Sequence, residues 1–171
     1  MDGWVTWHRQ TEDGAVESEQ RVALSGPVVE FSSAGGVELG SAYWREVRRA
    51  TRSLVRAREA GDSLELRLLG SGPTLLRFGP PTVETTQTLV SCTYPIEGGL
   101  LARQASGKIT FEQTGGLTPT VSSTIRGFFP RLAARQGRPT WTGALYDQLQ
   151  SRAHVAISRR YFKRLISEAR V

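Results

Sequence analysis

The sequence predicts an α+β fold in which a curved antiparallel sheet, a meander or a partly closed barrel, wraps around a long C-terminal helix. Three observations support this prediction. Short extended segments joined by turn residues follow one another over residues 63–125, a long amphipathic segment covers residues 142–169, and a second helical pattern lies near residues 41–59. Strands joined by short turns are typical of antiparallel sheets. A chain of 171 residues suits a single domain, expected to span residues 1–171.

The N-terminal part is expected to be extended over residues 4–8 and 15–31, with a loop at 32–36. The helix at 41–59 is predicted because apolar residues recur there at i, i+3, i+4 and i+7, and Ser41 is its expected N-cap. Its apolar face holds Trp44, Val47, Ala50, Thr51, Leu54 and Val55, and its other face holds Arg45, Arg48, Arg49, Arg52, Arg56 and Arg58.

The strands are predicted from the alternation of apolar and polar residues, which has the two-residue period of a pleated strand. Ile109 and Phe111 are expected to face inward, while Thr110 between them faces outward. The expected strands begin at Ser63 and then cover residues 74–78, 83–94, 100–104, 108–113 and 120–125, with the fourth and fifth segments forming a hairpin.

The C-terminal helix is predicted most strongly, because a long apolar stripe with helical spacing runs through residues 142–169. So wide a stripe must lie along a large hydrophobic surface, and the concave side of the sheet is the candidate. The stripe consists of Leu145, Leu149, Ala153, Ala156, Ile157, Tyr161 and Leu165.

This order of elements resembles the helix-grip fold of the START and pollen-allergen-like superfamily over most of the chain. The stretch Tyr94-Pro95-Ile96-Glu97-Gly98-Gly99-Leu100-Leu101, the later Gly127-Phe128-Phe129-Pro130 and the helix around His154 resemble small bacterial proteins near that superfamily. The resemblance implies a cavity between sheet and helix for lipids, steroids, polyketides or hormone-like molecules, in carriers, cyclases, aromatases or dehydratases. The chain departs from the pattern by showing one longer helix where two short ones are usual. A lipocalin-like closed barrel with an appended helix is therefore the alternative.

Several classes of site are excluded by composition and motifs. The single Cys92 cannot form an internal disulfide, and with only His8 and His154 it cannot form a Cys/His zinc cluster. Acidic metal loops, glycine-rich phosphate loops and a GxSxG nucleophile elbow are also missing from the sequence. We therefore expect no metal and no cofactor.

Location is predicted in the same way. The segment Met1-Asp2-Gly3-Trp4 lacks the basic-then-apolar signature of a signal peptide, and no stretch has the roughly 20 apolar residues of a membrane span. These features predict a cytoplasmic protein without a membrane span. All basic residues except Lys108 and Lys163 are arginine, which is typical of a GC-rich bacterial genome.

Three residues are candidates for catalysis. Tyr94 and Glu97 lie at a strand end beside Gly98-Gly99, and Glu97 in a dry pocket would have a raised pKa and could move a proton. His154 could act as a general base or acid from the helix. The alternatives are a solvated turn for Glu97 and a hydrogen-bonded histidine at the helix–sheet boundary.

The candidate ligand-binding residues are large amphipathic side chains and possible charged anchors. An inward-pointing arginine could hold a carboxylate or enolate, although alternation places Arg126 on the polar face of its strand. Core packing is the alternative for the aromatic members. The candidates are Trp44, Arg77, Phe111, Arg126, Tyr146, Gln150 and Tyr161.

The function favoured by these features is binding of a hydrophobic small molecule such as a lipid, polyketide or polyene. The same cavity could serve a cofactor-independent cyclase, lyase or isomerase of secondary metabolism that acts mainly by shaping its substrate.

The alternative function is a basic interaction module that binds an acidic protein such as an acyl carrier protein, or a nucleic acid. The net charge is +6, and residues 103–171 alone hold 12 basic and 3 acidic residues. Nucleic acid is the less favoured partner, because Glu46 and Glu59 interrupt the arginine face and no aromatic-basic strand signature is present.

Overall fold

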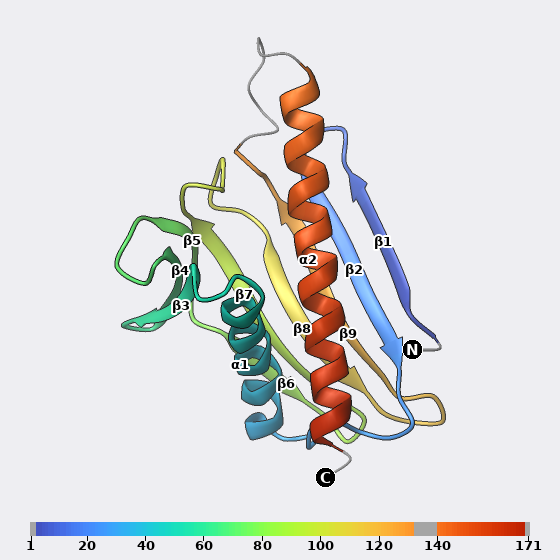
Figure 1. Ribbon diagram of the computed structural model, residues 1–171. Coiled ribbons are helices and arrows are strands. Elements are labelled where there is room, and N and C mark those ends of the chain that lie inside the picture. Colours follow the sequence, from blue (N-terminus) through green and yellow to red (C-terminus); the bar gives the residue numbers. More distant parts are fainter. Residues whose placement is uncertain (1–2, 132–139, 170–171) are drawn as a thin grey trace.

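The computed structural model describes residues 3–131 and 140–169, without the side chains of residues 140–151. The elements in chain order are β1 (Val5–Gln10), β2 (Val16–Ala23), α1 (Ser33–Ala50), β3 (Val55–Ala60), β4 (Ser63–Leu68), β5 (Thr74–Phe78), β6 (Thr82–Thr85), β7 (Leu89–Gly98), β8 (Lys108–Thr114), β9 (Thr120–Phe128) and α2 (Thr140–Glu168) (Figure 1).

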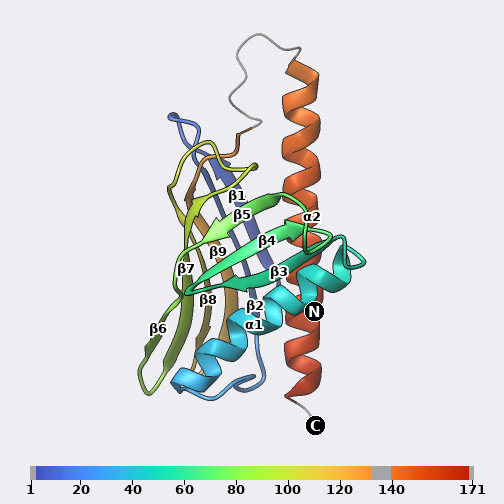
Figure 2. The same ribbon diagram turned by 90° about the vertical axis from the view of Figure 1, so that its left-hand side faces the viewer.

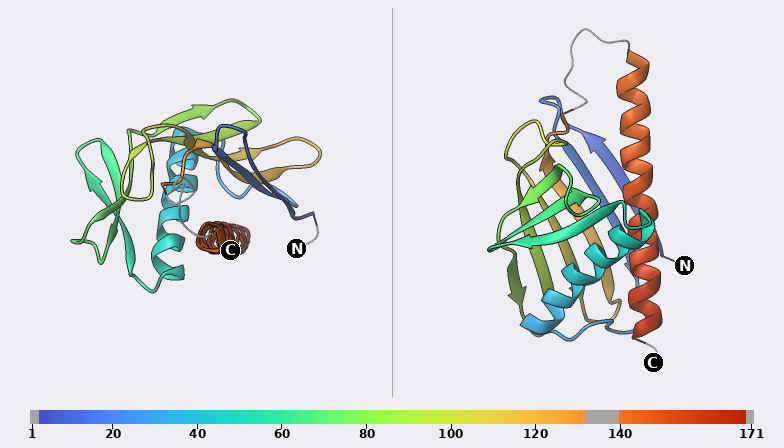
Figure 3. Two further views of the ribbon diagram at one scale, coloured as in Figure 1. Left: turned by 90° about the horizontal axis from the view of Figure 1, so that it is seen from above. Right: turned by 60° about the vertical axis from the view of Figure 1, so that its left-hand side comes forward.

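All the described strands belong to one antiparallel sheet with the order β1-β2-β9-β8-β7-β5-β4-β3. β7 is long enough to pair with β6 along its first half and with β5 at its end. The sheet curves, and its border strands β1 and β3 lie at opposite ends of the order (Figure 3). The predicted α+β fold class is therefore confirmed as an open helix-grip arrangement, and the closed-barrel alternative is wrong for the described part of the chain.

The long C-terminal helix α2 runs along the concave side of the sheet, as the sequence predicts (Figures 1 and 2). It contacts α1 and β2. Tyr161, Phe162 and Leu165 are buried there, and the Trp4 ring packs edge-on against Phe162 with 5.5 Å between ring centroids. The apolar stripe thus packs against the sheet and α1 over the last turns of the helix.

The first helix begins and ends about eight residues earlier than predicted. Its N-cap is Ser32, whose Oγ accepts a hydrogen bond from the Gly35 N–H, and not Ser41. Thr51 caps the C-terminal end, and Arg52 and Ser53 at positive φ turn the chain away from the helix. Residues 55–59, expected to be helical, therefore belong to the border strand β3 (Val55–Ala60).

Two other predicted strands are also corrected. Residues 83–94 hold two strands, because a turn at Thr86 and Thr88 separates them. The Thr88 N–H donates to Thr86 Oγ1 over 3.2 Å. Residues 100–104 do not form a hairpin arm, since only Ala102 is paired there, in an isolated bridge to Pro130. β8 pairs with β7 and β9 instead.

The chain after β2 is irregular, although the sequence predicts extended structure up to residue 31. The side chain of Gln113, which is buried on the sheet, forms hydrogen bonds with the backbone of this segment. Gln113 Oε1 accepts from the backbone N–H groups of Val28 and Val29 over 2.7 and 3.0 Å, and Gln113 Nε2 donates to the Val29 carbonyl over 2.8 Å. This segment leads directly into the N-terminus of α1.

α1 lies close to the sheet because two of its three buried glycines, Gly36 and Gly40, face strands of the sheet. A Cβ at Gly36 would collide with the Val83 side chain of β6, and a Cβ at Gly40 would lie 2.5 Å from the Tyr94 hydroxyl of β7. Gly35-Gly36 looks like a turn in the sequence, but Gly35 packs against the backbone of Glu30 and Gly36 serves helix–sheet packing. This contact brings Tyr43, Trp44 and Val47 against the sheet.

We expect Gly36→Ala to lower the free energy of unfolding by about 1–3 kcal/mol, because the new methyl group overpacks the contact with Val83. This expected loss of stability is opposite in sign to the usual effect of replacing glycine by alanine in a helix, which is stabilising. Val83→Ala in the same chain should recover most of the loss, which urea denaturation of the single and double variants would measure. Equal stability of Gly36→Ala and the unmodified protein would contradict the packing argument.

Candidate functional site

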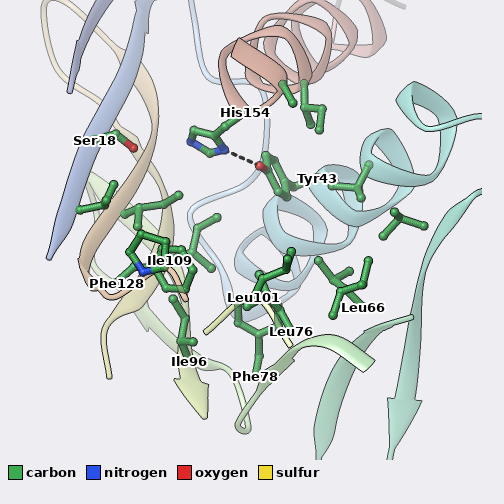
Figure 4. A pocket seen from close by; sticks show the side chains of 18 of the residues that line it. Ser18, Tyr43, Leu66, Leu76, Phe78, Ile96, Leu101, Ile109, Phe128 and His154 are labelled. Atoms are coloured by element: carbon green, nitrogen blue, oxygen red, sulfur yellow. Dashed lines mark hydrogen bonds between the residues drawn. The ribbon is translucent and has the colours of Figure 1, made fainter. Parts of the chain in front are cut away.

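A cavity of about 300 Å³, partly open to solvent, lies between the concave face of the sheet and the two helices (Figure 4). Its walls include residues of β2, β4, β5, β7, β8 and β9, the second half of α1, and residues 153–155 and 157 of α2. One turn further along α2, Tyr161 and Phe162 fill the corresponding space. The cavity thus occupies the part of the interior that large aromatic side chains leave open.

The lining is overwhelmingly apolar. None of the described residues that line the cavity is Asp, Glu, Lys or Arg. The polar lining residues are His8, Ser18, Gln20, Tyr43, Thr51 and His154, and the apolar ones are Val16, Trp44, Val47, Val55, Leu66, Leu75, Leu76, Phe78, Ile96, Leu101, Ile109, Ile125, Phe128, Pro130, Ala153, Val155 and Ile157.

Tyr43 and His154 form a hydrogen bond at the side of the cavity where the two helices meet (Figure 4). The Tyr43 hydroxyl oxygen lies 2.8 Å from His154 Nδ1. Tyr43 comes from the buried face of α1, and His154 comes from α2, so this bond joins the helices directly. Burial raises the pKa of the Tyr43 hydroxyl far above its ordinary value, and the Ser158 hydroxyl acts weakly in the opposite direction. Tyr43 therefore keeps its proton at neutral pH.

His154 is uncharged at neutral pH. Burial lowers its pKa to about 4, and the neighbouring His8 acts in the same direction. The side chain as a whole is partly exposed, but its Nε2 atom is enclosed and has no hydrogen-bond partner among the described residues. Buried polar atoms are rarely left without a partner. Nε2 is therefore the atom of this pair whose hydrogen bonding the described residues leave incomplete.

The remaining polar groups come from the first two strands. Alternation along β2 turns Ser18 and Gln20 inward, and His8 of β1 lies opposite Ser18 in the strand register. Ser158 of α2 donates to Gln20 Oε1 over 3.4 Å. With the Tyr43–His154 pair, these groups form a polar pole on the side of β1, β2 and α2, whereas β4, β5, β7 and β8 contribute only apolar side chains.

Two of the predicted site residues, His154 and Trp44, line the cavity. Tyr94 and Phe111 lie beside it in the aromatic core, with ring centroids 5.3 and 5.9 Å from that of Trp44. Tyr161 also belongs to this core, where burial raises the pKa of its hydroxyl far above the ordinary value. Tyr94 and His154 are therefore not brought together as a catalytic pair.

Two predicted charged residues lie on the outside of the molecule. Glu97 is exposed near the end of β7, and Arg77 is exposed on β5, where it donates to the Glu65 carboxylate over 2.6 Å. This hydrogen bond holds the pKa of Glu65 below its ordinary value. Neither predicted residue lines the cavity.

Arg126 lies on the convex face of the sheet, as strand alternation indicates, and does not line the cavity. Its guanidinium group bridges Glu17 and Glu19 of β2 over 3.4 and 3.7 Å and covers the ring of Trp7 in β1, 4.6 Å from the ring centroid. We refer to Arg126, Glu17, Glu19 and Trp7 as the outer clasp, because they tie β9, β2 and β1 together. The side chains of Tyr146 and Gln150, also predicted to bind ligand, lie outside the described residues.

The sequence analysis missed Tyr43, Ser18, Gln20 and His8 as site residues. A usable signal was present for two of them: Val16, Ser18, Gln20 and Val22 alternate with charged residues, so the polar pair shares the inward face of β2. Tyr43 carried no distinct signal, since it sits beside Trp44 in a helix whose start was placed too late. Its partner His154 is 111 positions away in the chain.

Two observations concern metals and membranes. Among the described residues, no group of three or more His, Cys, Asp or Glu side chains is arranged to hold a metal ion. In the same part of the chain, neither helix combines the length and hydrophobicity that crossing a membrane requires.

Comparison with known proteins gives a limited result. No protein-family model and no curated protein matches the chain. Two solved structures are similar along nearly the whole chain. Ara h 8.0201 has a TM-score of 0.41 and 11% identity over 94% of this chain and 99% of its own. CalU16 from Micromonospora echinospora has a TM-score of 0.35 and 11% identity over 98% of both chains. Similarity this low carries no conclusion about function, which depends on the site itself.

The depressed pKa of His154 makes stability depend on pH. The folded protein binds this proton only near pH 4, whereas an unfolded histidine binds it near pH 6.5, so stability falls as pH drops through this window. We expect a loss of about 3 kcal/mol that His154→Phe abolishes, measured by urea denaturation at several pH values. Parallel pH profiles for the two proteins would show that His154 is not the buried neutral group described here.

Proposed function

We propose that the protein is a single binding domain that holds a small, mainly apolar molecule in the cavity between its sheet and helices. The observation that carries this proposal is the lining: a cavity of about 300 Å³ whose described residues are apolar apart from one polar pole and include no charged side chain. Ligand pockets of proteins typically have this size and composition, with a few polar groups to orient the ligand.

The cost of an empty cavity supports the same proposal. Protein interiors are close-packed, and voids larger than a water molecule are few. At about 24 cal/mol per Å³ of unfilled core, a void of this volume would cost at most about 7 kcal/mol. An apolar molecule that fills the space recovers part of that free energy through burial and dispersion contacts. The polar pole then determines how the molecule is oriented.

The second part of the proposal is that the protein chemically converts the molecule that it binds. At pH 7 His154 is neutral and is not a general acid, and its pKa of about 4 makes it a weak base. A cofactor-independent cyclase, lyase or isomerase in this site would therefore depend on proximity and orientation rather than on strong acid–base chemistry. A carrier function needs no such chemistry and uses the same lining.

Val155→Trp is expected to abolish ligand binding, because Val155 lines the cavity and the indole would occupy it. The matched control is Ala156→Trp, which adds the same side chain at the next, exposed position of α2. The measurement is titration with the uncharged fluorophore N-phenyl-1-naphthylamine. We expect saturable binding by the unmodified protein and Ala156→Trp, and a loss of about tenfold or more in Val155→Trp, equivalent to about 1.4 kcal/mol.

Thermal unfolding of both variants would confirm that they are folded. The proposal fails if the unmodified protein binds no apolar probe, or if Val155→Trp binds as tightly as Ala156→Trp.

An acidic carrier protein remains our proposed partner. The arginines predicted to form one helix face, numbered 45, 48, 49, 52, 56 and 58, are all exposed, and they are divided among α1, the turn at Arg52 and the adjoining strand β3. Arg45 and Arg49 are engaged by Glu38 and Glu46. The arginine surface thus presents positive charge to a negatively charged partner.

Reversing charge on the arginine surface with Arg52→Glu and Arg56→Glu should weaken binding of an acidic acyl carrier protein and reduce its salt dependence. Lys108→Glu, an exposed reversal on β8, serves as the control. Binding can be followed by calorimetric titration at low and high salt. Equal affinity of all three proteins would contradict this partner, and binding of DNA in its place would support the nucleic-acid alternative.

A further inference from the structure

The charges and polar groups of the lining restrict the class of ligand more narrowly than its apolar side chains alone do. A charged ligand group would enter a cavity in which no described side chain offers an opposite charge. Removing an ion from water without a compensating partner is strongly unfavourable. The cavity therefore selects against carboxylates and ammonium groups, while a neutral polar group loses much less on entering it.

The hydrogen bonds of Tyr43 determine which nitrogen of His154 carries the proton. If Tyr43 donates to Nδ1, the hydroxyl proton of the tyrosine forms this hydrogen bond, and the neutral imidazole carries its own hydrogen on Nε2. If Nδ1 donates to Tyr43 instead, both the tyrosine proton and Nε2 need further partners. Nε2 has no partner among the described side chains in either arrangement, so the first arrangement leaves one group unpaired and the second leaves two. His154 then presents a buried N–H donor.

From these two observations we propose that the bound molecule is uncharged and carries a carbonyl-type oxygen that accepts a hydrogen bond from His154 Nε2–H. This inference rests on the proposed function and specifies the ligand class of the same cavity. Tyr43 acts as a positioning residue, because its hydroxyl fixes both the tautomer and the orientation of the imidazole ring. The apolar remainder of the ligand lies along the side chains of β4, β5, β7 and β8.

The size of the cavity sets the scale of suitable probes. A cavity of about 150 Å³ holds benzene, so a cavity of about 300 Å³ that is also partly open to solvent holds at least about twice as many carbon-sized atoms. A medium-chain ketone such as 2-decanone has this size. Its hydrocarbon isostere, 2-methyl-1-decene, replaces the oxygen by a methylene group and cannot accept the hydrogen bond. Decanoate and decylammonium are charged molecules of the same length.

The test is displacement of N-phenyl-1-naphthylamine by these four molecules at pH 7. We expect the ketone to bind about threefold to tenfold more tightly than the isosteric alkene, as one neutral hydrogen bond allows. We expect decanoate and decylammonium to bind at least about tenfold more weakly than the ketone. In His154→Phe the advantage of the ketone over the alkene should disappear, while the affinity for the alkene changes by less than about twofold.

Ser18→Ala tests the rival polar group of the same pole, and Ser167→Ala, which removes an exposed hydroxyl of α2 outside the cavity, is the control that should preserve the ketone's advantage. The inference is overturned if ketone and alkene bind equally, if decanoate or decylammonium binds most tightly, or if Ser18→Ala and not His154→Phe removes the preference. In each of these cases the cavity still binds an apolar molecule and the proposed function stands. If none of the four molecules displaces the probe, the proposed function fails together with the inference.

Discussion

Tyr43 occupies the point where α1, α2 and the sheet meet, and the rest of the interior is arranged around its contacts. Its ring packs against Phe111 of β8 at 4.5 Å and edge-on against Tyr161 of α2 at 5.5 Å between ring centroids. Its hydroxyl reaches His154 on the same helix. A single side chain thus ties both helices to the sheet with its apolar ring and forms the polar pole with its oxygen. Packing and recognition are coupled through one residue.

The cavity follows from the sizes of the side chains along α2. Where Tyr161 and Phe162 point inward, aromatic rings fill the space between helix and sheet, and the packing is dense. One to two turns earlier α2 borders the cavity with the smaller side chains of Ala153, Val155 and Ile157, beside His154. The same helix therefore provides a solid anchor at one end and a wall of a binding site at the other.

The fold class could be predicted from the sequence because it depends on periodicity, which is a local property. The stripe of α2 and the alternation of Ile109, Thr110 and Phe111 led to elements that the structure contains. The start of α1 was misplaced because Gly35-Gly36 resembles a turn, whereas both glycines lie in the helix and Gly36 contacts β6. The break between β6 and β7 was missed because the turn is made by a threonine hydroxyl rather than by glycine or proline.

The site was much less predictable, for a physical reason. His154 and Trp44 were identified as candidates from their residue types, but the partner of His154 lies on another helix. Which side chains face one another across a cavity depends on long-range packing and sheet register, and one sequence does not display either. Strand alternation placed Arg126 correctly on the polar face, where it forms the outer clasp instead of a ligand anchor.

The outer clasp has a consequence for how copies of the protein behave toward one another. An open sheet leaves its border strands with unpaired backbone groups, and such borders are templates for edge-to-edge aggregation. The clasp holds β1 in its register with β2 and surrounds that border with the charges of Arg126, Glu17 and Glu19, to which the Arg9–Glu17 ion pair adds another. The opposite border, β3, carries Arg56, Arg58 and Glu59. If a strand of another copy were added at either border, these charges would lose their contact with water. The sheet can therefore stay open, as the cavity requires, without promoting edge-to-edge aggregation.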